Sequence, residues 1–110
     1  MTTTEKNKLI AEFMGYIDNG CSEEGFLIHP DTNYDIEIET LQYHSSWDWL
    51  MPVVEKIESL GYRVTIVKHI CRIDLNEESK LLISEDIKKI EAVYTVCFKF
   101  IQWYNQNKLD

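Results

Sequence analysis

Two adjacent apolar stripes at helical spacing near the end of the chain constrain the fold more than any other feature. The members of the first stripe are alternately three and four residues apart: Ile87, Ile90, Tyr94, Cys97, Ile101 and Tyr104. The second stripe runs beside it: Val93, Val96, Phe100 and Trp103. Together they form an apolar face that is wider than a helix on a protein surface requires. We therefore predict a long final helix, capped by Ser84, that packs on both a sheet and other helices. The alternative is a helix that buries one stripe against a partner.

Shorter patterns predict the other elements. A first helix is expected over residues 5–14, with Thr4 as its N-cap, followed by a short strand at 26–28 and a longer one at 34–43. The next helix opens near residues 45–46, becomes regular from residue 49 and ends at Gly61. Pro52 is then expected in its first turns, where a missing N–H leaves no hydrogen bond unmade. Residues 62–75 predict two antiparallel strands with a turn near 68–69.

These elements define the expected fold class, which is α+β. A small antiparallel sheet, contributed by segments before and after the middle helix, packs with three helices, of which the C-terminal one is longest. A chain of 110 residues fits a single domain over residues 1–110.

The charge balance limits the class of partner. The chain has 11 Lys and Arg residues against 19 Asp and Glu residues, a formal net charge of −8 at pH 7. Because the neutralisation of phosphates by basic groups supplies most of the affinity for nucleic acids, direct DNA binding is not expected. A larger protein with a basic surface is the expected partner. No apolar run approaches the roughly 18 residues of a membrane span, and the start lacks the apolar stretch of a signal peptide, so a cytoplasmic location is expected.

The cysteines and histidines do not form a recognisable reactive motif. Cys21, Cys71 and Cys97 are odd in number and widely spaced, which argues against a disulfide framework. A zinc site needs four nitrogen or sulfur ligands, and only His69 and Cys71 are close in sequence. A thiol–imidazole pair between His44 and one of the later cysteines is a third hypothesis, but no motif surrounds either thiol. Since Gly-rich phosphate loops are also missing from the sequence, we expect no enzyme, no cofactor, no metal and no catalytic residue.

An acidic ladder is the first of two features that indicate a binding surface. Its carboxylates alternate with apolar residues along the predicted strand: Asp35, Glu37 and Glu39. On one strand face such side chains repeat about every 6.6 Å, so they are suited to a basic groove on another protein. The alternative is a solvated strand face that protects a sheet edge from aggregation.

Two tryptophans at the start of the middle helix are the second feature. Trp47 and Trp49 follow Tyr43 and His44, and so many large side chains are difficult to bury together in a small fold. We expect at least one indole to remain partly exposed, and tryptophans dominate interface hot spots. The alternative is that both indoles clamp this helix onto the last one.

The segment over residues 43–58 (YHSSWDWLMPVVEKIE) resembles one found in small uncharacterised proteins of bacterial and phage genomes. Residues 7–15, 91–94 and 100–105 are similar to the same group. The resemblance implies no activity and no catalytic or binding residue. It does suggest a phage setting, in which small acidic proteins include anti-CRISPR and other anti-defence inhibitors.

The leading hypothesis is therefore a non-enzymatic interaction module that uses the ladder and the two tryptophans. Its sharpest form is a phage-encoded inhibitor of a bacterial defence nuclease or of the nuclease's complex with guide RNA. The alternative is a homo-oligomeric accessory or regulatory domain, for example a homodimer, that associates through Val96, Phe100 and Trp103 of the last helix.

Overall fold

The structure is a computed structural model that describes residues 1–18, 26–32, 34–77 and 80–107. Within these ranges lie the helices α1 (Thr3–Phe13), α2 (Trp47–Ser59) and α3 (Lys89–Asn107), and the short 3-10 helix η1 (Ile38–Thr40). The strands are β1 (Phe26–Ile28), β2 (Asp35–Glu37), β3 (Arg63–Val67), β4 (Ile70–Glu77) and β5 (Lys80–Glu85). The expected α+β class is confirmed, and α3 is the longest of these helices.

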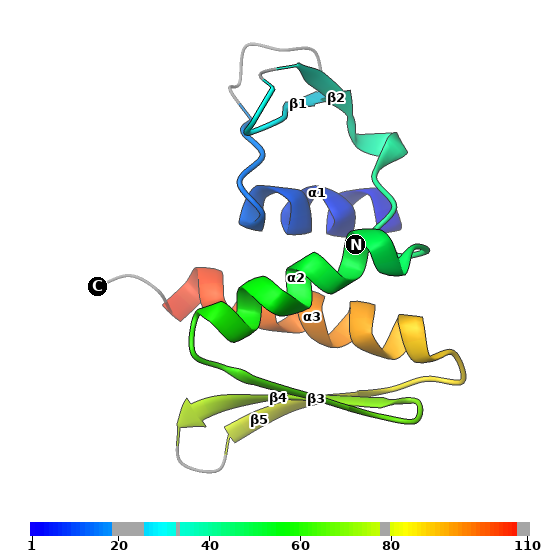
Figure 1. The fold of residues 1–110 in the computed structure, drawn as a ribbon, viewed down its shortest axis with the longest axis vertical. Helices are drawn as coiled ribbons and strands as arrows, with labels where there is room; N and C mark the ends of the chain where they lie inside the picture. The colour runs from blue at the N-terminus through cyan, green and yellow to red at the C-terminus, as the bar shows by residue number, and fades with distance from the viewer. Residues whose placement is uncertain (19–25, 33, 78–79, 108–110) are drawn as a thin grey trace.

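The elements lie in layers along the longest axis of the molecule (Figure 1). The sheet β3–β4–β5 is covered on one face by α2, which contacts β3, and by α3, which contacts β4 and β5. Helix α1 packs on the other side of α3, and the hairpin β1–β2 lies beyond α1 at the opposite end from the sheet. The last helix is thus central, with the sheet on one side and helices on the other, as its two stripes predict.

Most of the apolar face of α3 is buried within the chain, and its members Ile90, Trp103 and Tyr104 are partly buried. Val93, Val96, Phe100 and Ile101 are completely buried. Of the three residues through which the homo-oligomer hypothesis would associate, Val96 and Phe100 are covered within the chain, whereas Trp103 is partly buried. None of the helices in the described ranges is long and apolar enough to cross a membrane.

The three-stranded sheet contains the predicted pair of strands and one that was missed. Strands β3 and β4 pair antiparallel from Arg63↔Asp74 to Val67↔Ile70, with a turn at residues 68–69, as predicted. Residues 80–85 were expected to lead into the last helix, but they form β5 beside β4.

Ser84 is a buried residue of β5 rather than a helix cap, and α3 begins only at Lys89. Ile87, placed in the helical seam by its spacing, lies before the helix and is 97% exposed. The prediction of a helix cap at Ser84 failed because residues 80–85 instead pair with β4, whose edge would otherwise be unpaired. Pairing residues 80–85 with β4 satisfies the backbone N–H and C=O groups of that edge. The Ser-Glu-Asp run at 84–86 has the composition of a helix start, and this misled the sequence interpretation.

The strand predicted over residues 34–43 is much shorter, and the expected single sheet is two. Strand β2 pairs only with β1, from Phe26↔Glu37 to Ile28↔Asp35, and the chain then turns into η1. The Thr40 hydroxyl donates a hydrogen bond to the Glu37 carbonyl oxygen (2.6 Å), which closes this turn. Among the described residues, β1 offers only Phe26–Ile28 for pairing with β2, and Tyr34 is 73% exposed.

Both ends of α1 are fixed by capping motifs. The N-cap is Thr2 rather than Thr4: the Glu5 N–H donates to the Thr2 hydroxyl (3.1 Å) and the Thr2 N–H donates to the Glu5 carboxylate (2.8 Å). The backbone and hydroxyl of Thr2 thereby lower the pKa of Glu5. At the other end Gly15 has a left-handed φ of 105°, and the Tyr16 N–H donates to the Ala11 carbonyl oxygen (3.0 Å). This Schellman motif stops the helix and sets the direction of Tyr16.

A buried asparagine joins α1 to the last helix and to the segment before α2. Asn7 is 2% exposed, and its amide donates to the Leu41 carbonyl oxygen (3.1 Å) and lies 2.9 Å from His44 Nδ1. Its carbonyl oxygen accepts a hydrogen bond from the Tyr94 hydroxyl (3.0 Å). Both protons of the amide are therefore used, and the His44 Nδ1 is an acceptor.

Candidate binding site

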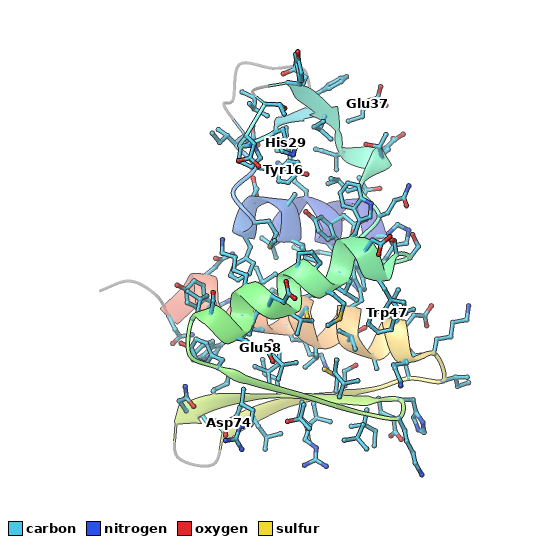
Figure 2. All side chains as sticks on the ribbon, viewed as in Figure 1. Tyr16, His29, Glu37, Trp47, Glu58 and Asp74 are labelled. Atoms are coloured by element: carbon cyan, nitrogen blue, oxygen red, sulfur yellow. The ribbon has the colours of Figure 1, made fainter. Side chains whose placement is uncertain are left out.

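A cleft of about 640 Å³ lies between the hairpin, the end of α1 and the start of α2. Figure 2 shows Tyr16 and His29 together on its hairpin side, whereas Glu37 lies on the outer side of β2. The cleft is within the size range of small-ligand and peptide side-chain pockets. Its lining combines aromatic rings with a few polar groups: Tyr16, His29, Asp31, Tyr43, Asp48 and Trp49.

One aromatic wall is formed by Tyr16 and His29. Tyr16 comes directly after the Schellman motif, and its ring meets that of His29 edge to face, with centroids 5.2 Å apart at 66°. His29 is oriented by the tight turn after β1, where its Nδ1 accepts a hydrogen bond from the Asp31 N–H (3.1 Å). The ring is thus fixed so that the neutral imidazole carries its proton on Nε2.

The second aromatic wall is formed by Tyr43 and Trp49. Their rings are perpendicular, with centroids 5.3 Å apart. The Tyr43 and Tyr16 hydroxyls share a hydrogen bond that connects the two walls. Burial raises the pKa of both hydroxyls above the ordinary value, so both tyrosines are neutral at pH 7.

Helix α2 brings Asp48, Trp49 and Pro52 to the cleft, and its start differs from the expected one. The helix begins at Trp47, two residues earlier than the predicted regular start, so Pro52 is its sixth residue. At that position an N–H would normally donate to the Asp48 carbonyl oxygen, and proline has none. The expectation that Pro52 leaves no hydrogen bond unmade is therefore wrong. The Asp48 carbonyl oxygen lacks its helical donor on the turn that lines the cleft.

The chain segments that line the cleft contain acidic residues and no Lys or Arg, although the Lys56 ammonium reaches the Phe13 carbonyl oxygen beside Met14 of the lining. The 47 residues from 9 to 55 contain ten Asp and Glu residues and no Lys or Arg, whereas the rest of the chain contains 11 basic and nine acidic residues. Five exposed carboxylates lie on the hairpin, η1 and the first turn of α2: Asp31, Asp35, Glu37, Glu39 and Asp48. Within the described ranges, none of these five makes an ion pair. The field at this end of the molecule is therefore negative.

The predicted acidic ladder is only partly present. Asp35 and Glu37 are exposed on one face of β2, while Ile36 on the opposite face lines the cleft. Glu39 is exposed but belongs to η1, so the three carboxylates do not form one strand row. The ladder prediction is wrong in this respect, because the turn at Thr40 ends the strand after Glu37. Glu23 and Glu24, which are near the ladder in sequence, lie outside the described residues.

The two predicted tryptophans do not form one patch. Two positions along a helix differ by about 200°, so Trp47 and Trp49 point to different sides of α2. Trp49 is half-buried in the cleft, whereas Trp47 is 37% exposed and is not part of the lining. The expectation that at least one indole stays partly exposed is confirmed. Trp49 clamps α2 to Tyr43 rather than to α3.

The thiols are buried and lie away from the cleft. Burial raises the pKa of the Cys71 thiol to about 11 and raises that of Cys97 still further, so neither is a thiolate at pH 7. Neither Cys71 nor His44 lines the cleft. Cys21 lies outside the described residues. Among the residues that are described, no group of three or more His, Cys, Asp or Glu side chains could hold a metal ion.

Five cleft residues were not among the predicted binding residues: Tyr16, His29, Asp31, Tyr43 and Asp48. Two signals in the sequence could have indicated them. The absence of any basic residue between positions 9 and 55 marks the acidic end of the molecule. The Gly15–Tyr16 pair after an amphipathic helix is typical of a Schellman motif, which places the residue after glycine against neighbouring structure.

Compared with known proteins, the chain matches no family model, no curated protein and no solved structure.

Proposed function

We propose that this chain is a non-enzymatic binding protein whose acidic end docks onto a basic surface of a larger protein. The observation that carries the proposal is the set of five exposed carboxylates in a region without a single Lys or Arg. Like charges gathered in this way repel one another, and a cationic partner removes that repulsion while it gains attraction.

The hairpin supplies the part of this surface that projects furthest. It lies at one end of the longest axis, so a partner can reach Asp35 and Glu37 on β2 without contacting the sheet (Figure 1). Glu39 continues the negative surface along η1 towards the start of α2. Trp47, exposed at the first residue of α2, adds an aromatic group of the kind that contributes most to interfaces.

The most specific candidate for the partner is a protein whose basic surface binds nucleic acid. Such surfaces are lined with Lys and Arg because they neutralise phosphates, and a protein with clustered carboxylates can take the place of the phosphates. The expected activity is then inhibition of a nucleic-acid-binding effector, which agrees with the anti-defence role that the phage resemblance suggests.

Matched charge reversals test the proposal. Asp35→Lys with Glu37→Lys changes the hairpin, and Glu58→Lys with Glu91→Lys makes the same change of net charge on exposed residues of α2 and α3 (Glu58 is labelled in Figure 2). Both variants and the wild-type chain are immobilised at equal density and exposed to lysate of the organism that encodes it. We expect basic proteins to be retained by the wild type and by the second variant but not by the first, and to be displaced by duplex DNA or RNA.

Equal retention by all three proteins would contradict the proposal, because only net charge would then matter. Retention that does not weaken between about 50 and 500 mM salt would contradict it as well, since exposed charges are screened over this range.

A further inference from the structure

The cleft beside the hairpin has the composition of a site for a cationic side chain. We infer that it receives an arginine side chain of the partner protein, with the guanidinium between the aromatic walls and the carboxylates of Asp31 and Asp48. This inference rests on the proposed function, because it identifies the group on the basic surface that enters the acidic end.

Aromatic rings border the cleft on two sides, with Tyr43 itself almost fully buried behind Trp49. Tyr16 and His29 form one edge-to-face pair and Tyr43 and Trp49 another, so ring faces are presented in more than one direction. A guanidinium is attracted to the face of an aromatic ring, most strongly to that of tryptophan. The hydrogen bond between the two tyrosine hydroxyls holds the walls together before a ligand arrives, which limits the entropy lost on binding.

The two carboxylates of the cleft are acceptors, as a guanidinium requires. The Asp31 and Asp48 carboxylates approach from different elements, the turn of the hairpin and the first turn of α2, and no basic residue is part of the described lining. Five N–H donors in a fixed plane can use acceptors that lie on several sides.

Arginine fits this set better than lysine. Its guanidinium stacks on rings, binds carboxylates with two parallel hydrogen bonds and is less strongly hydrated than an ammonium group. The apolar lining, which includes Met14, Ile36 and Pro52, suits the methylene stem of the side chain. A volume of about 640 Å³ also leaves room for the residues that flank the arginine in a protein segment.

The inference is tested with three capped tripeptides that differ at one position: Gly-Arg-Gly, Gly-Lys-Gly and Gly-citrulline-Gly. Citrulline has the shape of arginine without its charge. The readout is the indole N–H resonances of the three tryptophans in a heteronuclear NMR titration, assigned with Trp47→Phe. We expect the Arg peptide to shift the Trp49 resonance saturably, about tenfold more tightly than the citrulline peptide, while Trp47 and Trp103 do not move.

Two double substitutions, each of which removes two carboxylate charges, test which carboxylates bind the guanidinium. Asp31→Asn with Asp48→Asn should weaken the Arg peptide about tenfold, whereas Asp35→Asn with Glu37→Gln, the same charge change outside the cleft, should leave its affinity within about twofold. Equal affinity for arginine and citrulline, equal weakening by both variant pairs, or no saturable shift of Trp49 would each overturn the inference.

These outcomes are separate from those of the charge-reversal capture. If retention of basic proteins depends on Asp35 and Glu37 but the tripeptides are not distinguished, the docking surface stands and only the arginine site is wrong. If the Arg peptide binds in the cleft but no basic protein is retained, the proposed function fails.

Discussion

The sheet end and the hairpin end of this molecule differ in charge and in packing. At the sheet end, charges of both signs alternate across the strands, as Arg63 opposite Asp74 illustrates, and α2 and α3 cover the inner face. At the hairpin end the charged residues described in the hairpin, η1 and the first turn of α2 are all acidic, and the aromatic rings border a cleft. The comparison indicates that packing at the sheet end provides most of the stability of the fold. The hairpin end can therefore carry clustered carboxylates, although repulsion between like charges lowers stability.

The same difference is visible in the aromatic residues. Phe100 is fully buried and meets the rings of Phe13, Tyr62, Trp103 and Tyr104, with centroid distances of 4.9 to 6.2 Å. The rings at the hairpin end meet only in pairs and leave a cavity between the pairs. We therefore expect substitutions to affect stability at one end and binding at the other.

The largest effect is expected where the rings converge. Phe100→Ala removes the centre of the cluster and should lower the free energy of unfolding by about 3–5 kcal/mol, since the cavity cannot collapse between α3 and its neighbours. Ile36→Ala, at the half-buried hairpin position, should lower it by about 1 kcal/mol. Urea denaturation measures both, and equal losses would remove the distinction between the two ends.

The second-largest loss of stability is expected at the buried hydrogen bonds that join α1 to α3 and to the segment before α2. Asn7→Ala should destabilise the protein by about 2–3 kcal/mol, because the Leu41 carbonyl oxygen and the Tyr94 hydroxyl then lack partners in a buried place. Tyr94→Phe should be milder, at about 1 kcal/mol, because it leaves only the Asn7 oxygen unpaired. Thermal or urea unfolding followed by circular dichroism tests the order, and a larger loss for Tyr94→Phe would contradict it.

The third prediction concerns the stability of the protein at alkaline pH, which depends on buried groups of the well-packed part. Burial raises the pKa of Cys71 to about 11 and that of Tyr94 to about 12, from ordinary values of 9.0 and 10.0. Groups with a raised folded pKa contribute stability that is complete below the unfolded pKa and is lost as the pH rises towards the folded one. Stability should be level from pH 7 to about 9 and should fall between pH 9 and 12.

The measurement for this comparison is a set of urea midpoints from pH 7 to 11. Cys71→Ala should flatten the decline from pH 9 onward, although it lowers the stability at pH 7. An unchanged slope in this variant would show that the decline has another origin.

The smallest effect on stability is expected at the acidic surface itself. Asp35→Asn with Glu37→Gln should change the free energy of unfolding by less than about 0.5 kcal/mol, because both side chains are exposed and unpaired among the described residues. A slight gain is the expected sign, since repulsion is relieved. A loss above about 1 kcal/mol in urea denaturation would mean that the hairpin carboxylates support the fold.

Periodicity predicted the elements whose neighbours lie close in sequence. The two stripes of the last helix and the turn between β3 and β4 were recognisable because their residues alternate or recur at fixed intervals. Strand β5 was not recognisable from the sequence. Its residues Leu81 and Ile83 on the outer face and Leu82 on the inner face form a continuous apolar run. Such a run has no period of two, and the apparent helix cap at Ser84 then favoured the wrong element.

Sequence periodicity could not predict the cleft. Its lining comes from four separated segments, around residues 14–16, 29–31, 36–43 and 48–52, whose meeting is decided by how the hairpin folds back over α1. Trp49 was identified as a binding residue, but its partner Tyr43 was noted only as a neighbour. The orientation of each ring depends on a local detail, such as the left-handed Gly15, that matters only once the tertiary contacts are known.

The contact between Asn7 and Tyr94 has a consequence for the order in which the chain acquires its shape. The two residues are 87 positions apart, so α1 cannot dock against Tyr94 until the residues between them have emerged from the ribosome. Until then its apolar side has no α3 to cover it. We therefore expect the closure of this long loop to be a late step on the way to the tertiary structure.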